Sequence, residues 1–349
     1  MSTKKTIYDI AEEAGVSPTT VSRALSGKGY ISPETRDRVL AIAQGFTPRQ
    51  RGEKTVERIQ SYTLGLVVGH SSHYFFANDV YSDIMNGICE TATPRGYTLL
   101  MDVRNSDITE LLNTYEKGKV DGYILLGVKN SNPIIFGLIE AEVPFVLIGD
   151  YVDEYGVPPY SKVDIDDFSA AKEATDYLLT LGHKRIGFIS HSFEYASSFN
   201  RYLGYKSALK ESGIECDEKF VVRFDKISEE STINLTKRML YQSVIPTAII
   251  TSNCLISVSV CQAIKECGLS IPKDISVLGF DDSAFAKHYN PPLTTIWQPS
   301  EEKGRIATEY LMAAIEKKAL PKETVTLPSM IIYRESCCPP PESRTSVIQ

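Results

Sequence analysis

Several features of other protein classes are missing from these 349 residues. No apolar run approaches the roughly 18 residues that a membrane-spanning helix needs. Lys4 and Lys5 are followed by no apolar stretch of the kind found in a secretory signal. The 7 cysteines include no C-x-x-C pair, so neither a disulfide framework nor a zinc site is expected. These absences predict a cytoplasmic protein that contacts no membrane.

The sequence also lacks the common signatures of enzymes. It contains no nucleophile elbow, no phosphate-binding loop and no cluster of metal ligands. Asp281 and Asp282 are adjacent rather than opposed, unlike the carboxylate pair of a glycosidase. We therefore expect no catalytic residue, no metal and no cofactor.

Positive charge is scarce over most of the chain and concentrated at its beginning. The formal net charge is −7, whereas residues 1–60 carry +3 and the remaining residues carry −10. A basic segment attached to an acidic body is typical of a DNA-binding head on a soluble core.

Residues 6–25 predict two short helices joined by a tight turn. Thr6 can cap the first helix, and Gly15 permits the turn that ends it. Ser17 can cap the second helix, with Pro18 at its first position, where proline is favoured. A third helix is expected to begin near residue 32. The order of helix, turn and helix is that of proteins which insert a helix into the major groove of DNA.

The second predicted helix leaves small polar side chains and one arginine on exposed faces, namely Thr19, Thr20, Ser22 and Arg23. Serine and threonine reach phosphates and base edges, and arginine can bind guanine with two hydrogen bonds. DNA binding is therefore our interpretation of this segment. A generic helical bundle without a DNA role is the alternative that amphipathicity alone would allow.

From residue 62 onward, strands and helices alternate. Continuous apolar strands between helices predict an α/β body of two doubly wound parallel-sheet subdomains, each covered by helices on both faces. The strands are expected at 64–68, 98–101, 122–126, 144–148, 185–189, 220–222, 247–251 and 275–280. The helices are expected at 80–92, 108–117, 134–140, 170–181, 203–211, 233–241 and 255–266.

Polar residues follow several of these strands. Asp150, Asn253 and Asp281 each come just after a predicted strand, and Arg201 lies in the segment after strand 185–189. Ligands of such folds bind at the carboxyl ends of the strands. An arginine there can donate two hydrogen bonds to adjacent hydroxyls or to a carboxylate. Trp297 could stack on a sugar face or serve in packing.

Specific motifs carry a resemblance to a known family. The head reads Tyr8-Asp9-Ile10-Ala11, Ala14-Gly15-Val16-Ser17 and Thr20-Val21-Ser22-Arg23-Ala24-Leu25, and the body contains Gly182-His183-Lys184-Arg185-Ile186 and Val277-Leu278-Gly279-Phe280-Asp281-Asp282. Together these closely resemble the lactose-repressor (LacI/GalR) family over about residues 6 to 336. The resemblance implies a dimeric transcriptional regulator, a repressor by expectation, that binds operator DNA and a small molecule such as a sugar.

The resemblance also implies roles for individual residues. In the head, Pro18, Thr19 and Arg23 would face bases, while Ser17, Thr20 and Ser22 would contact phosphates. Thr6 is included among the DNA-binding candidates. In the body, the expected effector-binding residues are Phe76, Tyr81, Asp150, Arg201, Asn253, Asp281 and Gln298.

The expected domain boundaries follow from the same resemblance. Residues 1–47 form the head, 48–61 the linker, 62–336 the effector-binding core, and 337–349 a disordered tail. Within the core, the N-subdomain is expected to span about 62–161 plus 293–322, and the C-subdomain about 162–292 plus 323–336.

The segment from His70 to Tyr81 is longer than the usual first loop of the family, and two further departures bear on function. The linker lacks the Ala-Arg pair and the leucine that the family inserts into the minor groove, so Val56 is the only apolar residue placed to act as a wedge. Alternatively, the linker is a basic tether that uses Arg49 and Arg51 on phosphates. The family has Asn-Asp where this chain has Asn253-Cys254. These departures keep a second function open, namely a sugar-binding protein whose head or linker is degenerate.

Overall fold

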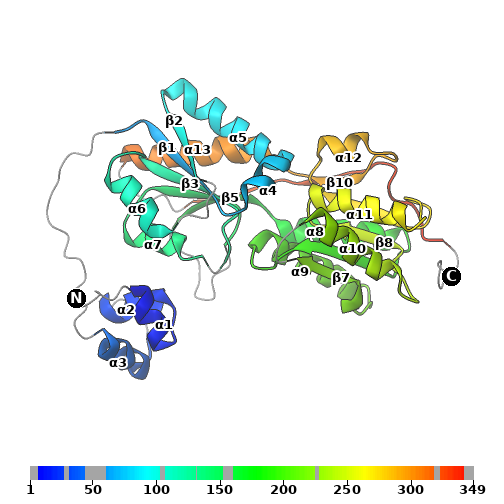
Figure 1. Cartoon of the computed structure of the whole chain (residues 1–349), viewed down its shortest axis with the longest axis horizontal. Coiled ribbons are helices and arrows are strands. Elements are labelled where there is room, and N and C mark those ends of the chain that lie inside the picture. Colours follow the sequence, from blue (N-terminus) through cyan, green and yellow to red (C-terminus); the bar gives the residue numbers. More distant parts are fainter. Residues whose placement is uncertain are drawn as a thin grey trace.

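The computed structural model describes residues 7–26, 31–43, 60–102, 107–130, 132–151, 160–224, 228–317 and 323–341. The first two ranges hold three short helices, α1 (Ile7–Ala14), α2 (Pro18–Ser26) and α3 (Pro33–Ile42). The other ranges form two α/β subdomains that lie next to each other (Figure 1). The predicted fold class, a helical head followed by two doubly wound subdomains, is confirmed.

The first subdomain is built on a six-stranded parallel sheet with the order β11-β5-β4-β3-β1-β2. Its strands are β1 (Thr63–Val68), β2 (Thr98–Asp102), β3 (Gly122–Leu126), β4 (Phe145–Ile148), β5 (Ser161–Ile165) and β11 (Thr324–Leu327). Its helices are α4 (Ser72–Ala77), α5 (Asp79–Ala92), α6 (Ile108–Glu116), α7 (Ile134–Glu140) and α13 (Ser300–Lys317), with a 3₁₀ turn at Thr93–Arg95. One face of the sheet packs against α5 and α13, and the other packs against α6 and α7. Both faces are thus buried, as the continuous apolar strands predict.

The second subdomain repeats this arrangement with the order β12-β10-β9-β8-β6-β7. Its strands are β6 (Ile186–His191), β7 (Val221–Phe224), β8 (Ala248–Thr251), β9 (Ser276–Phe280), β10 (Thr294–Trp297) and β12 (Met330–Ile332). Its helices are α8 (Asp167–Thr180), α9 (Ala196–Glu211), α10 (Glu229–Leu240), α11 (Cys254–Glu266) and α12 (Ala284–His288), with a 3₁₀ turn at Glu218–Phe220. Helices α8 and α9 cover one face of the sheet, and α10 and α11 cover the other. The pairing of β10 with β12 is antiparallel, and the other strand pairs are parallel.

The described chain passes between the subdomains at three places: after β5, after β10 and after β11. Strand β5 pairs with β4 and therefore lies in the first sheet, whereas we expected the C-subdomain to begin at 162. Strand β10 pairs with β9 in the second sheet, although the segment 293–322 was expected in the N-subdomain. Strand β11 returns to the first sheet beside β5, although 323–336 was expected in the C-subdomain. Each crossing thus lies a few residues from its expected place, because a single strand joins the neighbouring sheet before the chain continues.

The expected tail also begins later than predicted. The main-chain N–H of Cys338 donates to Ser276 Oγ at 3.0 Å, and a ring nitrogen of His183 lies 2.9 Å from the Cys338 carbonyl oxygen. Cys337 packs against the core of the second subdomain. Residues 337 and 338 are thus part of that subdomain, and residues 342–349 lie outside the described chain.

Candidate nucleic-acid interface and ligand cleft

The three head helices close one small core. Ile10, Val21 and Val39 contribute one fully buried side chain from each helix. Gly15 has φ +63°, a left-handed conformation that glycine adopts without strain, and it ends α1 as predicted. Ser17 Oγ accepts a hydrogen bond from the N–H of Thr20 at 3.1 Å and thereby caps α2. The backbone of the head therefore has the helix–turn–helix order that the sequence predicts.

The structure places only some of the predicted DNA-binding side chains. Ser17 and Thr20 are half-buried at the start of α2, with their hydroxyl oxygens 2.9 Å apart. Pro18 is the first residue of α2 and is also half-buried. The backbones of Thr19, Ser22 and Arg23 belong to α2, but their side chains lie outside the described part of the chain, as do Thr6, Arg49, Arg51 and Val56 altogether.

A cavity lies between the two subdomains, at the carboxyl ends of both sheets. It has an empty volume of about 820 Å³, counting the part open to solvent. Six of the seven predicted effector-binding residues line it: Tyr81, Asp150, Arg201, Asn253, Asp281 and Gln298. The structure thus brings together residues that are up to about 200 positions apart in the sequence.

Phe76, the seventh candidate, is not in the cavity wall, and this prediction is wrong. Its side chain is 66% exposed, whereas Phe75 is buried and stacks on Tyr81 with ring centroids 5.0 Å apart. Helix α4 explains the difference, because consecutive side chains of a helix point about 100° apart. Tyr74, on the inner side of α4, lines the cavity instead.

Arg201 is held rigidly in the wall of the cavity. It lies in α9 with 7% of its surface exposed, and its Nε donates to Asp167 Oδ1 at 2.6 Å. A second nitrogen, Nη1, donates to the carbonyl oxygen of Ser252, and the guanidinium carbon lies 4.0 Å from the centre of the Phe280 ring. Burial raises the pKa of Asp167 to about 6, and the positive charge of Arg201 opposes this rise.

A chain of polar side chains runs across the floor of the cavity. Asp281 Oδ1 accepts from Gln298 Nε2 at 2.6 Å, and Gln298 Oε1 accepts from Lys303 Nζ at 2.7 Å. Lys303 Nζ also donates to Asp164 Oδ1 at 2.5 Å. The chain joins β9, β10, α13 and β5, so it connects the second subdomain to the first. Burial raises the pKa of Asp281, against the charge of Arg201.

Asp281 has an uncommon backbone conformation. Its φ is +72°, in the left-handed region that residues other than glycine rarely adopt. The N–H of Asp281 donates to the carbonyl oxygen of Ile296 at 2.9 Å, and Asp281 Oδ2 accepts from the N–H of Cys254 at 3.4 Å. Such conformations persist where the surroundings fix them, and they gather at ligand sites.

An aromatic wall faces this polar floor. The His70 ring lies between Tyr74 and Tyr195, with centroid distances of 4.7 and 4.4 Å. His191 meets the Tyr195 ring edge-on at 4.6 Å. Burial lowers the pKa of His70 to about 3, and the charges of His191 and Lys129 lower it further. His70 is therefore a neutral imidazole that stacks on Tyr195 of the second subdomain and lies tilted against Tyr74 of the first.

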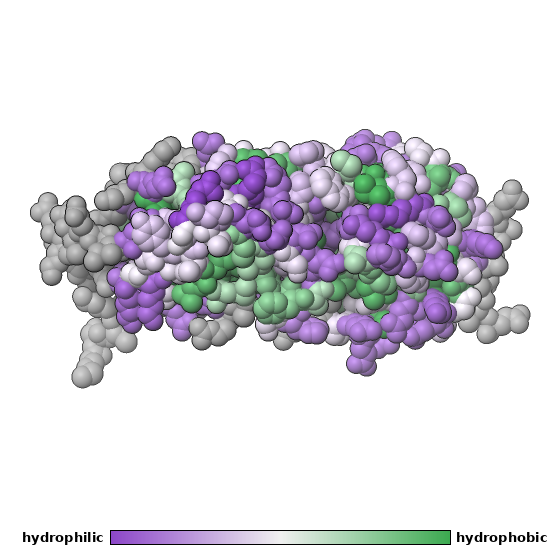
Figure 2. Space-filling view, turned by 90° about the horizontal axis from the view of Figure 1, so that it is seen from above, coloured by the Kyte–Doolittle hydropathy of each residue, from purple (hydrophilic) through white to green (hydrophobic). Residues whose placement is uncertain are grey.

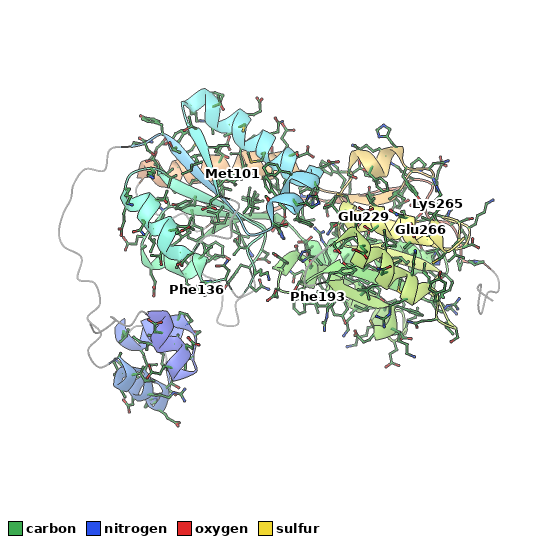
Figure 3. All side chains as sticks on the ribbon, in the orientation of Figure 1. Met101, Phe136, Phe193, Glu229, Lys265 and Glu266 are labelled. Atoms are coloured by element: carbon green, nitrogen blue, oxygen red, sulfur yellow. The ribbon has the colours of Figure 1, made fainter. Side chains whose placement is uncertain are left out.

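An aromatic pair also lies at the edge of the second subdomain near the cleft. Phe193 follows β6 and lies on the side of the second subdomain that faces the first (Figure 3). Its ring stacks on Tyr202 at 4.6 Å. This packing fixes the loop that carries Tyr195 into the aromatic wall.

The subdomains also touch directly across the cleft. Asn253 Nδ2 donates to the hydroxyl oxygen of Tyr74 at 3.2 Å, while Asn253 Oδ1 caps α11 by accepting from the N–H of Ile256 at 2.9 Å. Asn253 therefore joins the two walls and already uses both ends of its amide. Asp150, at the other side of the cavity, forms an ion pair with Lys162.

Several residues of this site were not predicted, namely His70, Tyr74, Asp164, Asp167, His191, Tyr195 and Lys303. His191 ends β6, so its position at the carboxyl end of a strand was an available signal. Lys303 gave no such signal, because a lysine in a helix is ordinarily exposed. Trp297 is half-buried and lines a different cavity beside α5 and α13.

Two further properties concern the described residues. Among them, no three His, Cys, Asp or Glu side chains are grouped so that they could hold a metal ion. No helix in the part of the chain that the structure describes is long and apolar enough to cross a membrane.

Comparison with known proteins connects the two sites. Residues 6–47 match the model described as bacterial regulatory proteins, lacI family, and residues 175–337 match the periplasmic binding protein-like domain. The HTH-type transcriptional regulator CelR of Thermobifida fusca is 31% identical over 339 residues, which cover 95% of this chain and 98% of CelR. Such relatives are named as transcriptional regulators rather than as enzymes.

Two solved structures resemble nearly the whole chain. The complex of the transcriptional regulator CelR with cellobiose has a TM-score of 0.78 and 29% identity, and the alignment covers 95% of this chain and 99% of that one. The lac repressor dimer bound to operator and the anti-inducer ONPF has a TM-score of 0.68 and 26% identity, with 96% and 100% covered. In both cases the similarity includes the head as well as the body.

Proposed function

The chain belongs to the lacI family of bacterial regulatory proteins, and from this we propose that it is a repressor whose binding to operator DNA is controlled by a sugar held in the cleft. Membership of the family makes it a DNA-binding transcriptional regulator. Repression, the chemical class of the effector and the roles of individual residues are the further parts of the proposal. The cellobiose complex of the CelR relative supports a sugar as effector.

One observation carries the effector part of the proposal. The six predicted residues that line the cavity come from both subdomains, so a ligand bound there contacts both at once. A ligand that contacts both halves favours the conformation in which they are close together. This change reaches the head through residues that lie outside the described chain.

For the head, we propose that α2 enters the major groove. Arg23, Thr19 and Pro18 would then face base edges, while Ser17, Thr20 and Ser22 would contact phosphates. The cap formed by Ser17 supports this role, because it fixes the end of α2 that would approach the DNA. Contacts of Thr6, Arg49, Arg51 and Val56 with DNA stay predictions.

We also propose that the regulator acts as a homodimer in the bacterial cytoplasm, where operator DNA is found. Two heads would read the two halves of a pseudo-palindromic site. Apolar residues gather over the first subdomain on the face seen in Figure 2. In the same subdomain, the edge strand β2 exposes 44% of Leu100. Sedimentation of the full chain checks this part of the proposal.

Replacing Arg23 tests whether α2 recognises the bases of the operator. After footprinting has located the operator, Arg23→Ala should lower affinity by about 10- to 100-fold and relax the preference at one base pair, as expected for loss of one bidentate contact of about 1–3 kcal/mol. Arg238→Ala, which removes an exposed arginine of α10, is the matched control and should bind as the wild type does. If Arg23→Ala keeps both affinity and sequence preference, the proposed role of α2 is wrong.

A further inference from the structure

The cavity between the subdomains carries more negative than positive charge. Its charged lining residues are Asp150, Asp164, Asp167, Asp281, Arg201 and Lys303. Both cations are already used, because Arg201 pairs with Asp167 at 2.6 Å and Lys303 pairs with Asp164 at 2.5 Å. Asp150 pairs with Lys162 at the edge. Asp281 alone among these acids forms no ion pair with any described residue, so the excess charge resides there.

Asp164 provides a hydrogen-bond acceptor that nothing in the described chain satisfies. The residue is 9% exposed, and Lys303 occupies its Oδ1. Its Oδ2 is buried and has no hydrogen-bond partner among the described residues. Native structures rarely leave a buried carboxylate oxygen unpaired, and such an atom often marks the place of a missing partner.

Asp164 also lines two separate cavities. It lines the main cavity and a second one of about 500 Å³, which Asn200 and Thr324 help to form on the side of β11. Asp150 and Asp167 line both cavities as well. These three acids therefore form a wall that the two cavities share.

Lys303 determines which groups the floor of the cavity offers. An ammonium can only donate, so its contact with Gln298 Oε1 at 2.7 Å turns the NH₂ of that amide toward Asp281. The amide NH₂ is thus occupied by a carboxylate. Lys303 acts here as a positioning residue, and it leaves oxygen acceptors rather than donors on this side of the cavity.

We propose that the effector is a polyhydroxy compound without negative charge, either neutral or bearing an amino group, and that Asp164 is the residue that selects it. This inference rests on the proposed effector function of the cleft. A hydroxyl or ammonium would donate to Asp164 Oδ2 and to Asp281. A phosphate or carboxylate would meet the excess charge of Asp281 and find both cations already neutralised.

Matched sugars test the charge preference. The probes are glucose, glucosamine, glucose 6-phosphate and glucuronate, together with ribose, ribose 5-phosphate, cellobiose and cellobionate. Thermal shift of the full chain identifies binders, and calorimetry then gives Kd. At least one neutral or amino compound should bind, and its anionic counterpart should bind at least 10-fold more weakly. The proposal fails if an anionic member binds as tightly as its neutral counterpart, or if no neutral or amino probe binds.

Asp164→Asn tests the selecting residue. The variant keeps the size of the side chain but removes its charge, so the Kd of the best neutral or amino probe should rise about 10-fold and the discrimination against its anionic counterpart should shrink. Asp164→Asn/Lys303→Met removes both charges of the buried pair and serves if the single variant does not fold. Asp176→Asn, at an exposed ion pair with Lys172 on α8, is the control and should keep the wild-type Kd. Unchanged Kd values in the Asp164 variants would contradict the assignment.

Operator binding and sugar preference are measured separately, so the proposed function and the inference about Asp164 can fail independently. Operator binding by the wild type without sugar tests the regulator itself and does not depend on the charge of the effector. A wild type that binds operator, and whose binding responds to an anionic sugar alone, would retain the proposed function and overturn the inference about Asp164.

Discussion

His70 shows how the cleft alters the chemistry of one side chain. Its ring lies between Tyr74 of its own subdomain, to which it is tilted, and Tyr195 of the other, on which it stacks. Burial, reinforced by the charges of His191 and Lys129, lowers the pKa of His70 to about 3. The folded protein therefore keeps His70 neutral at pH values where the unfolded chain, with a pKa near 6.5, takes up a proton.

This difference predicts how stability depends on pH. The contribution of His70 to the free energy of unfolding is complete above about pH 6.5, and it falls as the pH drops toward 3, because the unfolded chain then binds one more proton. In urea titrations between pH 7 and pH 5, His70→Gln should lose stability less steeply than the wild type. His73→Gln, at an exposed position of α4, should keep the wild-type slope. Equal slopes for wild type and His70→Gln would show that this histidine does not stay neutral.

The residues of the cleft differ in how far the sequence reveals them. Asp150, Asn253 and Asp281 could be predicted because each follows an apolar strand, and the carboxyl ends of parallel strands meet at one edge. Asp164 lies within β5, and Lys303 lies in a helix beside acidic residues, a pattern typical of an exposed face. Only the packing of α13 beside β5 makes them a buried pair, and this contact between distant segments has no local signal.

At the level of elements, the bounds of helices and strands were predicted well where the apolar periodicity is strong. They were predicted poorly where a helix begins without a side-chain cap. Helix α7 and strand β3 have the predicted bounds. Helix α9 begins at Ala196, seven residues before the predicted start, because its N-cap Tyr195 makes no side-chain capping bond and the first turn lacks an apolar stripe. Arg201, which precedes the predicted helix 203–211, consequently lies in the second turn of α9. The long helix α13 and the short strands β10, β11 and β12 were not predicted at all.

The contact between α5 and α13 depends on two glycines. A Cβ on Gly87 would lie 1.9 Å from the carbonyl oxygen of Glu301, and a Cβ on Gly304 would lie 2.1 Å from that of Ile84. Neither position has positive φ, so the glycines serve close approach rather than unusual backbone conformation. The helices therefore touch backbone to backbone, and this contact places Lys303 over β5.

Gly87→Ala should consequently destabilise the protein, although alanine is the better helix former. The gain in helix propensity is about 1 kcal/mol, but the backbone clash forces the helices apart, and overpacking of this kind costs about 1–3 kcal/mol or more. We expect a net loss in the free energy of unfolding measured with urea. Asn86→Ala, on the exposed face of α5, is the matched control and should be neutral or slightly stabilising. A Gly87→Ala midpoint at or above that of the wild type would contradict the close packing.

At the scale of the whole molecule, contacts at the rims of the cleft hold the subdomains together. On one side, Lys129 Nζ lies 2.6 Å from Glu194 Oε2, and the N–H of Asn130 donates to the carbonyl oxygen of Glu194 at 2.8 Å. On the other, the N–H of Ala284 donates to Asp79 Oδ2 at 3.1 Å. These contacts add to the stacking of His70 across the cleft. The approach of the two subdomains therefore depends on several weak interactions rather than on one strong one.

Removing the charged rim contacts should therefore open the molecule only slightly. Exposed ion pairs contribute about 0–1 kcal/mol, so Glu194→Gln/Asp79→Asn should weaken binding of any cleft ligand by no more than about 10-fold and raise the radius of gyration in solution scattering at low salt. Raising the salt concentration should move the wild type in the same direction, because screening weakens the Lys129–Glu194 pair. Glu266, which Figure 3 labels on the second subdomain, forms a comparable exposed pair with Lys237 of the same subdomain, and Glu266→Gln breaks it. It should leave the scattering curve unchanged. If the rim variant and Glu266→Gln scatter alike, the charged rim contacts do not hold the subdomains together, and the contacts inside the cleft, namely the aromatic wall, the Asn253–Tyr74 hydrogen bond and the Lys303–Gln298–Asp281 chain, would account for the closed arrangement.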